Sequence, residues 1–402
     1  MDSVYDYLRQ HSLHIPLDIR PGFTTTVGLV LLVAYLAVRR ARQRYASIPA
    51  IGGSGLLQSY LNGIRFLSDP GTMIEEGYKK VRSSNNINVA LFLNQNIEFG
   101  EEGIFRIPTP INWLVTLSPD RHLHETRGPN GHLLSASAAR YDELYHFRYH
   151  VPIIRGPLVK NTEWLEEIRN EISVTCEEMM PVSSEWKSIP LLPATRTIIT
   201  RSLYRIMLSE PDLSKRPEYI PILREEIESV VAKHGWTKQA LSSMEKLESF
   251  MMETLRFNSP DLLNSPRKAL TDYVLDNGIR IPKGSFVTVV ETSRHRDETV
   301  YPNAKEFDGL RFYNKNKEAS KEGNQPRQFT TISSDLIIFG VGPQACPGRF
   351  FATNVLKILL GYVLLTYDIK QDLNDPFVFG YKGLHWVPDP TKRLLFRERT
   401  TE

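Results

Sequence analysis

Cysteine is scarce in this sequence, where Cys176 and Cys346 are the only two among 402 residues. Two cysteines allow at most one disulfide, and these two lie too far apart to form the C-x-x-C pairs from which tetrahedral zinc sites are usually built. The sequence therefore does not support a disulfide-stapled secreted scaffold. We expect a cytosolic folded part in which a lone reactive thiol is available for a catalytic or ligand role.

A surplus of charge of one sign is also missing. Lys and Arg number 49 against 46 Asp and Glu, a formal net charge of +3, which gives no support for nucleic-acid binding. Glycine (24) and proline (26) are too few for a collagenous chain, whereas 41 % hydrophobic residues can fill a core. We expect one large or two ordinary globular domains.

Charged residues are absent from residues 22–38, a run of seventeen. At about 1.5 Å per residue, this run reaches the short end of what spans a bilayer core. Four arginines follow within residues 39–44, whereas only Arg9 and Arg20 precede the run, so the positive-inside rule places the C-terminal side in the cytoplasm. We predict a lumenal segment at 1–21 and a transmembrane helix at 22–38. The alternatives are a buried or interfacial helix and a cleaved signal peptide, whose basic region would precede its apolar run.

The rest of the chain is organised as a hinge followed by a body. Residues 39–55 are basic and end in the Pro/Gly-rich run IPAIGGSG, which predicts a hinge, and residues 56–402 form the predicted body. Apolar periodicity and turn signals predict helices at 164–180, from Pro217 or Pro221 to 234, at about 238–257 and at 350–367, and a hairpin at 273–290 around Asp276-Asn277-Gly278.

The segment 339–349 has the residues for metal chemistry. Cys346 precedes Pro347, the predicted first position of the last helix, where free N–H groups and the helix dipole favour a thiolate. Gly342 and Gly348 remove side chains on either side, so that a flat macrocycle can approach the backbone.

Two further residues bear on this cysteine segment. Phe339 can shield the sulfur from water. The pattern by itself fits a buried structural cysteine equally well, and that is our interpretation of Cys176, which lies on an apolar helical stripe.

The run from Phe339 to Ala352, FGVGPQACPGRFFA, resembles the haem-binding signature of the cytochrome P450 family in its fungal form, FGxGxxxCPGRFFA. The resemblance implies that Cys346 is the axial thiolate ligand of a haem iron. The family usually has Arg or His at the position of Gln344, where it meets a haem propionate; Gln344 can donate a hydrogen bond but has no charge. Arg267 is similar to a second propionate-binding arginine of the family.

Two other motifs of the family are present in the expected order. Glu253-Thr254-Leu255-Arg256 resembles E-x-x-R, whose i to i+3 spacing places both charges on one helical face. Residues 307–312, FDGLRF, resemble F-x-P-x-R-F with Gly309 in place of the proline. The resemblance implies a buried triad of Glu253, Arg256 and Arg311 that supports folding behind the haem.

We assign no chemical role to the histidines His122, His124, His132 and His295. His295 falls where fungal relatives have a histidine-containing turn, but a single histidine is more often structural. His122, His124 and His132 are interpreted as part of a solvated loop.

The sequence lacks the family's distal-helix motif, [A/G]-G-x-[D/E]-T-[T/S], whose acid and hydroxyl deliver protons to dioxygen. It also runs through residues 209–216 directly into a helix that relatives reach only after several others. We therefore predict an incomplete cytochrome P450-like fold, mainly α with a smaller β portion (α+β), with an internal deletion near 209–216. The distal catalytic residues stay unassigned.

The resemblance implies a haem-thiolate monooxygenase that oxidises an apolar small molecule with electrons from an NADPH-dependent cytochrome P450 reductase. Its cytosolic body would be anchored in the endoplasmic reticulum membrane. The signature and the segments RPEYIPILREE and GWTK resemble enzymes of fungal secondary metabolism that act on terpenoids or mycotoxin-like scaffolds. The alternative is a truncated, catalytically impaired or non-catalytic haem-binding remnant. A membrane-tethered interaction protein without haem would leave the signature unexplained.

Overall fold

The structure is a computed structural model of the whole chain. It describes residues 43–53, 55–83, 103–109, 112–127, 134–135, 163–190, 213–372, 380–387 and 391–400, and the single positions 29, 30, 32, 33, 35, 36, 39 and 194. The chain divides into two units, residues 1–47 and 48–402. In the first unit, the described positions 29 to 39 are helical, and the rest of the predicted transmembrane helix lies outside the described residues.

The second unit contains a five-stranded sheet with the strand order β1-β2-β8-β5-β3. The strands are β1 (Ile104–Pro108), β2 (Trp113–Leu117), β3 (Leu134–Ser135), β5 (Leu263–Ala269) and β8 (Phe286–Val290). β2 and β8 are parallel, and the other pairs are antiparallel. The β5–β8 register shifts between Asn264 and Arg267, and Ser265 there has φ +53°, which indicates a β-bulge.

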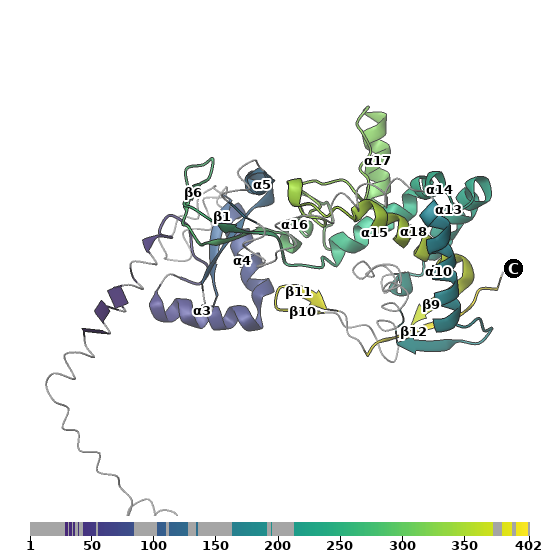
Figure 1. Cartoon of the computed structure of the whole chain (residues 1–402), viewed down its shortest axis with the longest axis horizontal. Helices are drawn as coiled ribbons and strands as arrows, with labels where there is room; N and C mark the ends of the chain where they lie inside the picture. Colours follow the sequence, from purple (N-terminus) through teal and green to yellow (C-terminus); the bar gives the residue numbers. More distant parts are fainter. Residues whose placement is uncertain are drawn as a thin grey trace, which may run out of the picture. The chain divides into compact units, whose positions relative to one another are not determined.

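Two helices pack on this sheet through apolar side chains. They are α3 (Leu56–Ser68) and α4 (Pro70–Ser83), and both contact β1 (Figure 1). Ile74 and Tyr78 of α4 and Phe105 of β1 are buried in the shared core. This apolar contact fixes the helices against the edge of the sheet.

A helical core forms the other part of the second unit. Its main helices are α10 (Glu163–Met179), α13 (Tyr219–His234), α14 (Lys238–Ser243), α15 (Glu245–Phe257) and α18 (Arg349–Thr366). α18 contacts α10, α13 and α14, and its apolar residues are buried on almost every side. The stripe predicted on α10 is confirmed, since Leu165, Ile172 and Cys176 are buried in this core.

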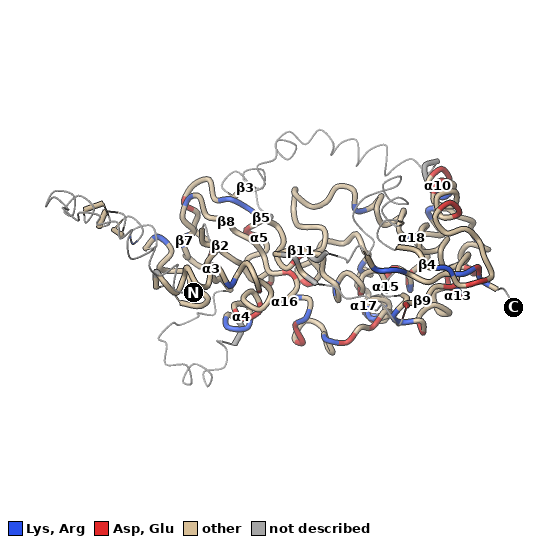
Figure 2. The backbone as a smooth tube through the Cα atoms, turned by 90° about the horizontal axis from the view of Figure 1, so that it is seen from below, with Lys and Arg blue, Asp and Glu red and all other residues tan. Residues whose placement is uncertain are grey.

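Shorter elements complete the described fold. The helices α5 (Pro119–Arg127), α16 (Thr292–His295) and α17 (Arg311–Lys321) and the 3-10 turn η3 (Gly342–Gln344) lie between the larger elements. A three-stranded antiparallel sheet joins β4 (Lys187–Pro190), β12 (Arg393–Glu398) and β9 (Tyr367–Gln371), and β10 (Gly380–Lys382) pairs with β11 (His385–Val387). Figure 2 shows basic and acidic positions interspersed along the described chain. The fold is thus a mixture of helix and sheet, as predicted.

The helix predicted at 238–257 is interrupted in the structure. Met244, with φ −81° and ψ 73°, separates α14 from α15. Both carboxylate oxygens of Glu226, on α13, accept backbone hydrogen bonds, from Lys246 N at 2.7 Å and Leu247 N at 2.9 Å. A side chain from another helix therefore supplies a cap at this break, and no periodicity within 238–257 could reveal it.

The predicted hairpin is correct in its turn and wrong in its length. Only β6 (Tyr273–Val274) and β7 (Arg280–Ile281) pair, around Gly278 with φ +83°. Residues 286–290 instead form β8, which inserts between β2 and β5. The Asp-Asn-Gly signal is local, whereas the partners of β8 are distant in sequence.

Among the described residues, α18 is long and apolar enough to cross a membrane by length and composition, but most of it is buried in the core. It is therefore a core helix.

Candidate functional site

Cys346 lies in a tight, exposed loop between η3 and α18. Its thiol is free, and its backbone N–H donates to the carbonyl of Phe339 at 2.8 Å, which closes the loop at its base. Gly340 (φ +69°) and Gly342 (φ +61°) have left-handed backbone conformations that favour glycine. The result is an exposed sulfur on a closed, glycine-containing turn.

The start of α18 differs from the prediction. The helix begins at Arg349 with Gly348 as its N-cap, so that Pro347 precedes the helix instead of being its first residue. Arg349 donates to the carbonyl of Cys346 at 2.9 Å and to that of Thr330 at 2.9 Å. Arg349, the first residue of α18, therefore holds the turn that contains Cys346.

The other predicted cofactor residues lie on β5, on η3 and in the segment before η3. Phe339 is partly buried against Phe329, with ring centroids 5.4 Å apart, and Gln344 ends η3 and is partly buried. Arg267 lies on β5, is 3 % exposed, and donates to the carbonyl of Thr126 at 3.1 Å. Since α5 also contacts η3, the arginine holds the end of the helix that adjoins the cysteine loop.

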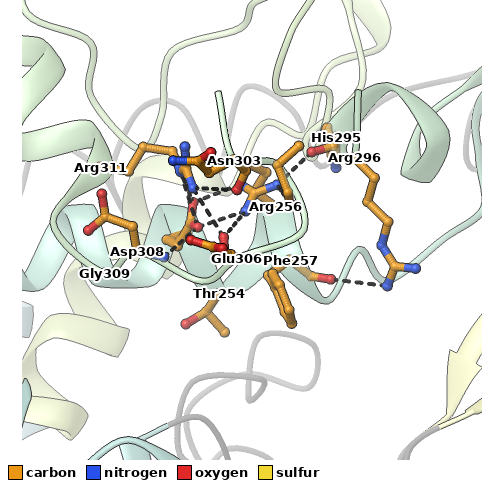
Figure 3. Close-up of polar contacts among 12 residues, drawn as sticks. Thr254, Arg256, Phe257, His295, Arg296, Asn303, Glu306, Asp308, Gly309 and Arg311 are labelled. Carbon is orange, nitrogen blue, oxygen red and sulfur yellow. Dashed lines mark hydrogen bonds and ion pairs between the residues drawn. The ribbon is translucent and has the colours of Figure 1, made fainter. Parts of the chain in front are cut away.

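The structure brings Glu253, Arg256 and Arg311 together. Glu253 and Arg256 have fully buried side chains and form a bidentate ion pair, with both N···O distances 2.7 Å. Arg311 Nε lies 3.2 Å from both Glu253 oxygens. The triad lies between α15 and the segment that leads into α17 (Figure 3).

The remaining N–H groups of this triad hold backbone carbonyls. Arg256 donates to the carbonyls of His295, Ala304 and Glu306, at 2.6, 2.8 and 3.1 Å. Arg311 also donates to the carbonyl of Glu306, at 3.1 Å (Figure 3). The three charged residues therefore tie α15 to the chain between α16 and α17.

The glycine that departs from the family motif has a local explanation. The N–H of Gly309 donates to the hydroxyl of Tyr219 at 3.1 Å, and a proline has no N–H to give. A Cβ at this glycine would also lie 2.8 Å from ring atoms of Phe250 and Tyr219. Here the packing of α13 and α15 requires glycine.

The prediction of a histidine-containing loop is wrong for the two described histidines, whereas the predicted solvent exposure is wrong for His122 and correct for His124. His122 and His124 are both on α5, and His122 is 4 % exposed. His124 lies 2.7 Å from a carboxylate oxygen of Asp276, in the turn of the hairpin. The predicted turn is therefore attached to α5, a contact with a sequence separation too large to be read from a local pattern. His132 lies outside the described residues.

His295, which received no role from the sequence, is fully buried beside the triad. Burial, and after it the positive charge of Arg256, lower the pKa of its imidazole to about 3. Its ring contacts Ser259 and the backbone of Ile337. The sequence signal for this position is its resemblance to a histidine-containing turn of fungal relatives, which by itself indicates no chemical role.

A haem fits the residues around Cys346 on the side of the thiol. A free, exposed cysteine on a closed turn is the donor that a haem iron takes as an axial thiolate ligand. Gly342 and Gly348 add no side chain beside it, and the buried Arg267 lies on β5 of the sheet. This donor set is suited to one thiolate bond.

Comparisons with known proteins agree with this chemistry. The family model described as Cytochrome P450 matches residues 204–393. Cytochrome P450 monooxygenase 71 of Postia placenta is 24 % identical over 511 aligned residues, covering 93 % of this chain and 97 % of the relative. Cytochrome P450 monooxygenase 151 of the same fungus is 40 % identical over 190 residues, 47 % of this chain and 38 % of the relative.

A third relative is cytochrome P450 monooxygenase paxQ of Penicillium paxilli, 39 % identical over 191 residues, which cover 47 % of this chain and 37 % of the relative. The cysteine loop, the buried triad and these similarities define the class. Residues 204–393 match the cytochrome P450 family, and the relatives named here are cytochrome P450 monooxygenases. The chain's cofactor is haem, and the three relatives named here are fungal enzymes.

Proposed function

We propose that Cys346 is the axial thiolate ligand of the haem in a membrane-anchored monooxygenase of fungal secondary metabolism. The observation that supports this assignment is the cysteine loop, in which a free exposed thiol stands on a turn closed by the Cys346–Phe339 hydrogen bond. When bound, the haem supplies the activation of dioxygen. The protein contributes the thiolate and the rigid turn that presents it.

The different exposure of the two cysteines provides a test. A maleimide should modify exposed Cys346 and leave Cys176, which is buried on α10, unmodified in the native full-length protein. Protein modified in this way should no longer bind added haem, measured by quenching of tryptophan fluorescence. Equal haem binding by modified and unmodified protein would contradict the assignment. The Cys176→Ala variant, treated in parallel, controls for modification elsewhere.

The substrate class is an apolar small molecule, with terpenoids and mycotoxin-like scaffolds as the first compounds to examine. Support comes from the fungal relatives of the C-terminal half, which include monooxygenases paxQ, atmQ and janQ. The electron donor is an NADPH-dependent cytochrome P450 reductase. Difference spectra on adding each compound to haem-loaded protein would test the class, and a preference for charged over apolar compounds would contradict it.

Attachment to the endoplasmic reticulum membrane, with the body in the cytosol, is the proposed location. Leu29, Val30, Leu32, Val33, Tyr35 and Leu36 are helical positions with side chains 47 % to 62 % exposed. On α3, which follows the predicted hinge, Leu57, Tyr60, Leu61, Ile64 and Leu67 are 49 % to 73 % exposed. Large exposed apolar surfaces of this kind suit a lipid surface. A body shielded from added protease in intact microsomes would contradict this topology.

A second candidate function is a haem-binding remnant with impaired catalysis. The alignment with the Postia placenta monooxygenase 71 is 511 residues long, more than the 402 residues of this chain, so that relative has residues with no counterpart here. The missing distal-helix motif supports a loss from the central part of the chain, near residues 209–216. Sequencing the transcript across the codons for these residues would distinguish a skipped exon from a real deletion.

A further inference from the structure

Two side chains from different elements, the fully buried His295 and the partly buried Asn264, hold the peptide groups of Ile337. Its N–H donates to Nε2 of His295, at the end of α16, at 3.3 Å. Its carbonyl accepts from Nδ2 of Asn264, on β5, at 2.9 Å. Ile337 is 1 % exposed, so neither backbone group has bulk water as an alternative partner. The bonds also span 42 and 73 residues of sequence, which means that the tertiary fold creates them.

The hydrogen bonds define the tautomer of His295. A backbone N–H can only donate, so Nε2 of His295 has no proton when it accepts from Ile337. The Nδ1 atom then carries the proton and donates to the hydroxyl of Ser259 at 2.5 Å. That hydroxyl donates in turn to the carbonyl of Arg256 at 3.4 Å. The imidazole is therefore neutral and fixed at both nitrogens, in agreement with its lowered pKa.

Asn264 is fixed just as closely. Of the two hydrogens on its amide nitrogen, one goes to the carbonyl of Ile337 and the other to the carboxyl of Glu291. Its amide oxygen accepts from the hydroxyl of Ser265 at 3.0 Å. The β-bulge at this point of β5 turns the asparagine toward Ile337. Burial of Glu291 raises the pKa of its carboxyl well above the ordinary value, which favours the neutral acid.

The held peptide leads directly into the cysteine loop. Phe339, two residues after Ile337, provides the carbonyl that accepts the N–H of Cys346 at 2.8 Å. On the other side, Arg256 donates to the carbonyl of His295 at 2.6 Å. A continuous path of hydrogen bonds and chain therefore links the buried triad, through His295 and Ile337, to the base of the loop that presents Cys346.

We propose that His295 and Asn264 are positioning residues that clamp the peptide of Ile337 and thereby fix the loop that presents the sulfur of Cys346. Neither residue touches the thiol. The functional meaning of the clamp rests on the proposed role of Cys346, whereas the clamp itself is a property of the polypeptide without haem.

Two substitutions of His295 distinguish hydrogen bonding to Ile337 from a role in which the side chain only fills a buried space. The amide of Asn can replace Nδ1 and keep the bond to Ser259, but it is too short to reach Ile337. The amide of Gln can replace Nε2 and keep the bond to Ile337. We expect His295→Asn, but not His295→Gln, to loosen the segment 336–346. If His295 were only structural, the two polar variants would behave alike.

Hydrogen exchange followed by mass spectrometry measures this on the full-length protein without haem. Losing the buried hydrogen bond should speed exchange in peptides covering 336–346 by about five-fold or more in His295→Asn. His295→Gln should stay close to the wild type, and Asn264→Ala should resemble His295→Asn. Equal exchange in His295→Asn and His295→Gln, whether slow or fast, would overturn the proposal.

A matched control is available on α15, one turn before Glu253. Ser249 is also buried and also joins two backbone groups, donating to the carbonyl of Gly309 at 2.9 Å and accepting from the N–H of Tyr313 at 2.9 Å. Ser249→Ala should speed exchange around residues 309–313 and leave 336–346 unchanged. If it speeds exchange in both regions equally, the loop responds to general destabilisation, and the proposal fails.

Haem binding distinguishes failure of the clamp from failure of the proposed function. With equal amounts of folded protein, His295→Asn should retain less thiolate-ligated haem than His295→Gln, measured from the Soret band with carbon monoxide. If Cys346→Ala leaves that band unchanged, the proposed function fails although the exchange result stands. If Cys346 holds the haem and the two His295 variants retain it equally, the clamp fails.

Discussion

At the scale of single residues, the buried guanidinium of Arg256 has all of its hydrogens engaged. Its five N–H groups make five hydrogen bonds, two to the carboxylate of Glu253 and three to backbone carbonyls. A fully buried cation needs this degree of compensation because removal from water is costly. Arg256 therefore holds three backbone carbonyls, those of His295, Ala304 and Glu306, around its guanidinium group.

Replacing Arg256 by Ala should lower the free energy of unfolding by roughly 3 to 5 kcal/mol, because the carboxylate of Glu253 would then be buried beside only one cation. Urea unfolding of the full-length protein measures the change. The control is Arg65→Ala, which removes the ion pair between Arg65 and Glu76. This pair has the same N···O distance of 2.7 Å, but its two side chains are 39 % and 37 % exposed. That variant should change the free energy by less than about 1 kcal/mol. Similar effects of the two variants would contradict a structural role of the triad.

His295 should make the protein less stable as the solution becomes acidic. The pKa of the imidazole is about 3 in the folded protein, below the ordinary 6.5, so the unfolded chain takes up the proton first as pH falls. The contribution of His295 to stability is full above pH 6.5 and is lost progressively toward pH 3, at up to about 1.4 kcal/mol per unit.

Urea unfolding at pH 7, 6 and 5 tests this dependence. The His295→Gln variant should show a smaller loss of stability between pH 7 and 5 than the wild type. Identical slopes would show that this imidazole is protonated in the folded protein or exposed to solvent.

The i to i+3 spacing of Glu253 and Arg256 places both on one face of a helix. The addition of Arg311 to the triad came from the resemblance to two motifs of the family. The sequence could not identify His295 or Asn264. Their partner, the peptide of Ile337, offers only backbone atoms, which have the same chemistry at every position. A contact between a side chain and a distant backbone group has no sequence pattern.

At the scale of elements, the break between α14 and α15 shows how tertiary contacts override helix periodicity. The residues from 238 to 257 have good helical patterning, yet Met244 leaves the helical conformation. Glu226 of α13 then satisfies two of the free N–H groups at the start of α15. Elements with a strong internal signal were located by sequence to within one or two residues, as the ends of α10 and α18 show.

Glu226→Ala should destabilise the protein by about 1 to 2 kcal/mol, because it removes both acceptors at the N-terminus of α15. Hydrogen exchange should also speed up at the amides of residues 246 and 247. The comparison is Glu228→Ala on the same helix, where an exposed carboxylate pairs with Arg399 at 2.6 Å. That variant should have an effect below about 1 kcal/mol. Unchanged exchange at 246 and 247 in Glu226→Ala would contradict the capping role.

At the scale of the whole molecule, the described part of the chain includes the cysteine loop, the charged triad and the helices α15 and α18. The sequence lacks the distal-helix motif of the family. We therefore expect haem ligation and catalysis to be separable properties of this chain. The sequence predicted the mixed α+β class correctly, but it missed β1 and β2, because the pairing of β2 with β8 joins segments about 170 residues apart.

The ratio of oxidised product to NADPH consumed should show the effect of the missing distal motif. With haem, a reductase and NADPH, we expect peroxide to account for most of the NADPH consumed, because the acid and hydroxyl pair that delivers protons in the family is absent from the sequence. Peroxide and oxidised product are measured together against a panel of terpenoids. Product equal to the NADPH consumed would show that other side chains replace the missing pair.

The central claim is that Cys346, and no other residue, provides the thiolate for haem. The most direct measurement is the absorption spectrum of the reduced protein under carbon monoxide, in the wild type, Cys346→Ala and Cys176→Ala. We expect the Soret band characteristic of thiolate-ligated haem in the wild type and in Cys176→Ala, and its loss in Cys346→Ala. An unchanged band in Cys346→Ala, or an equal loss in Cys176→Ala, would contradict the claim.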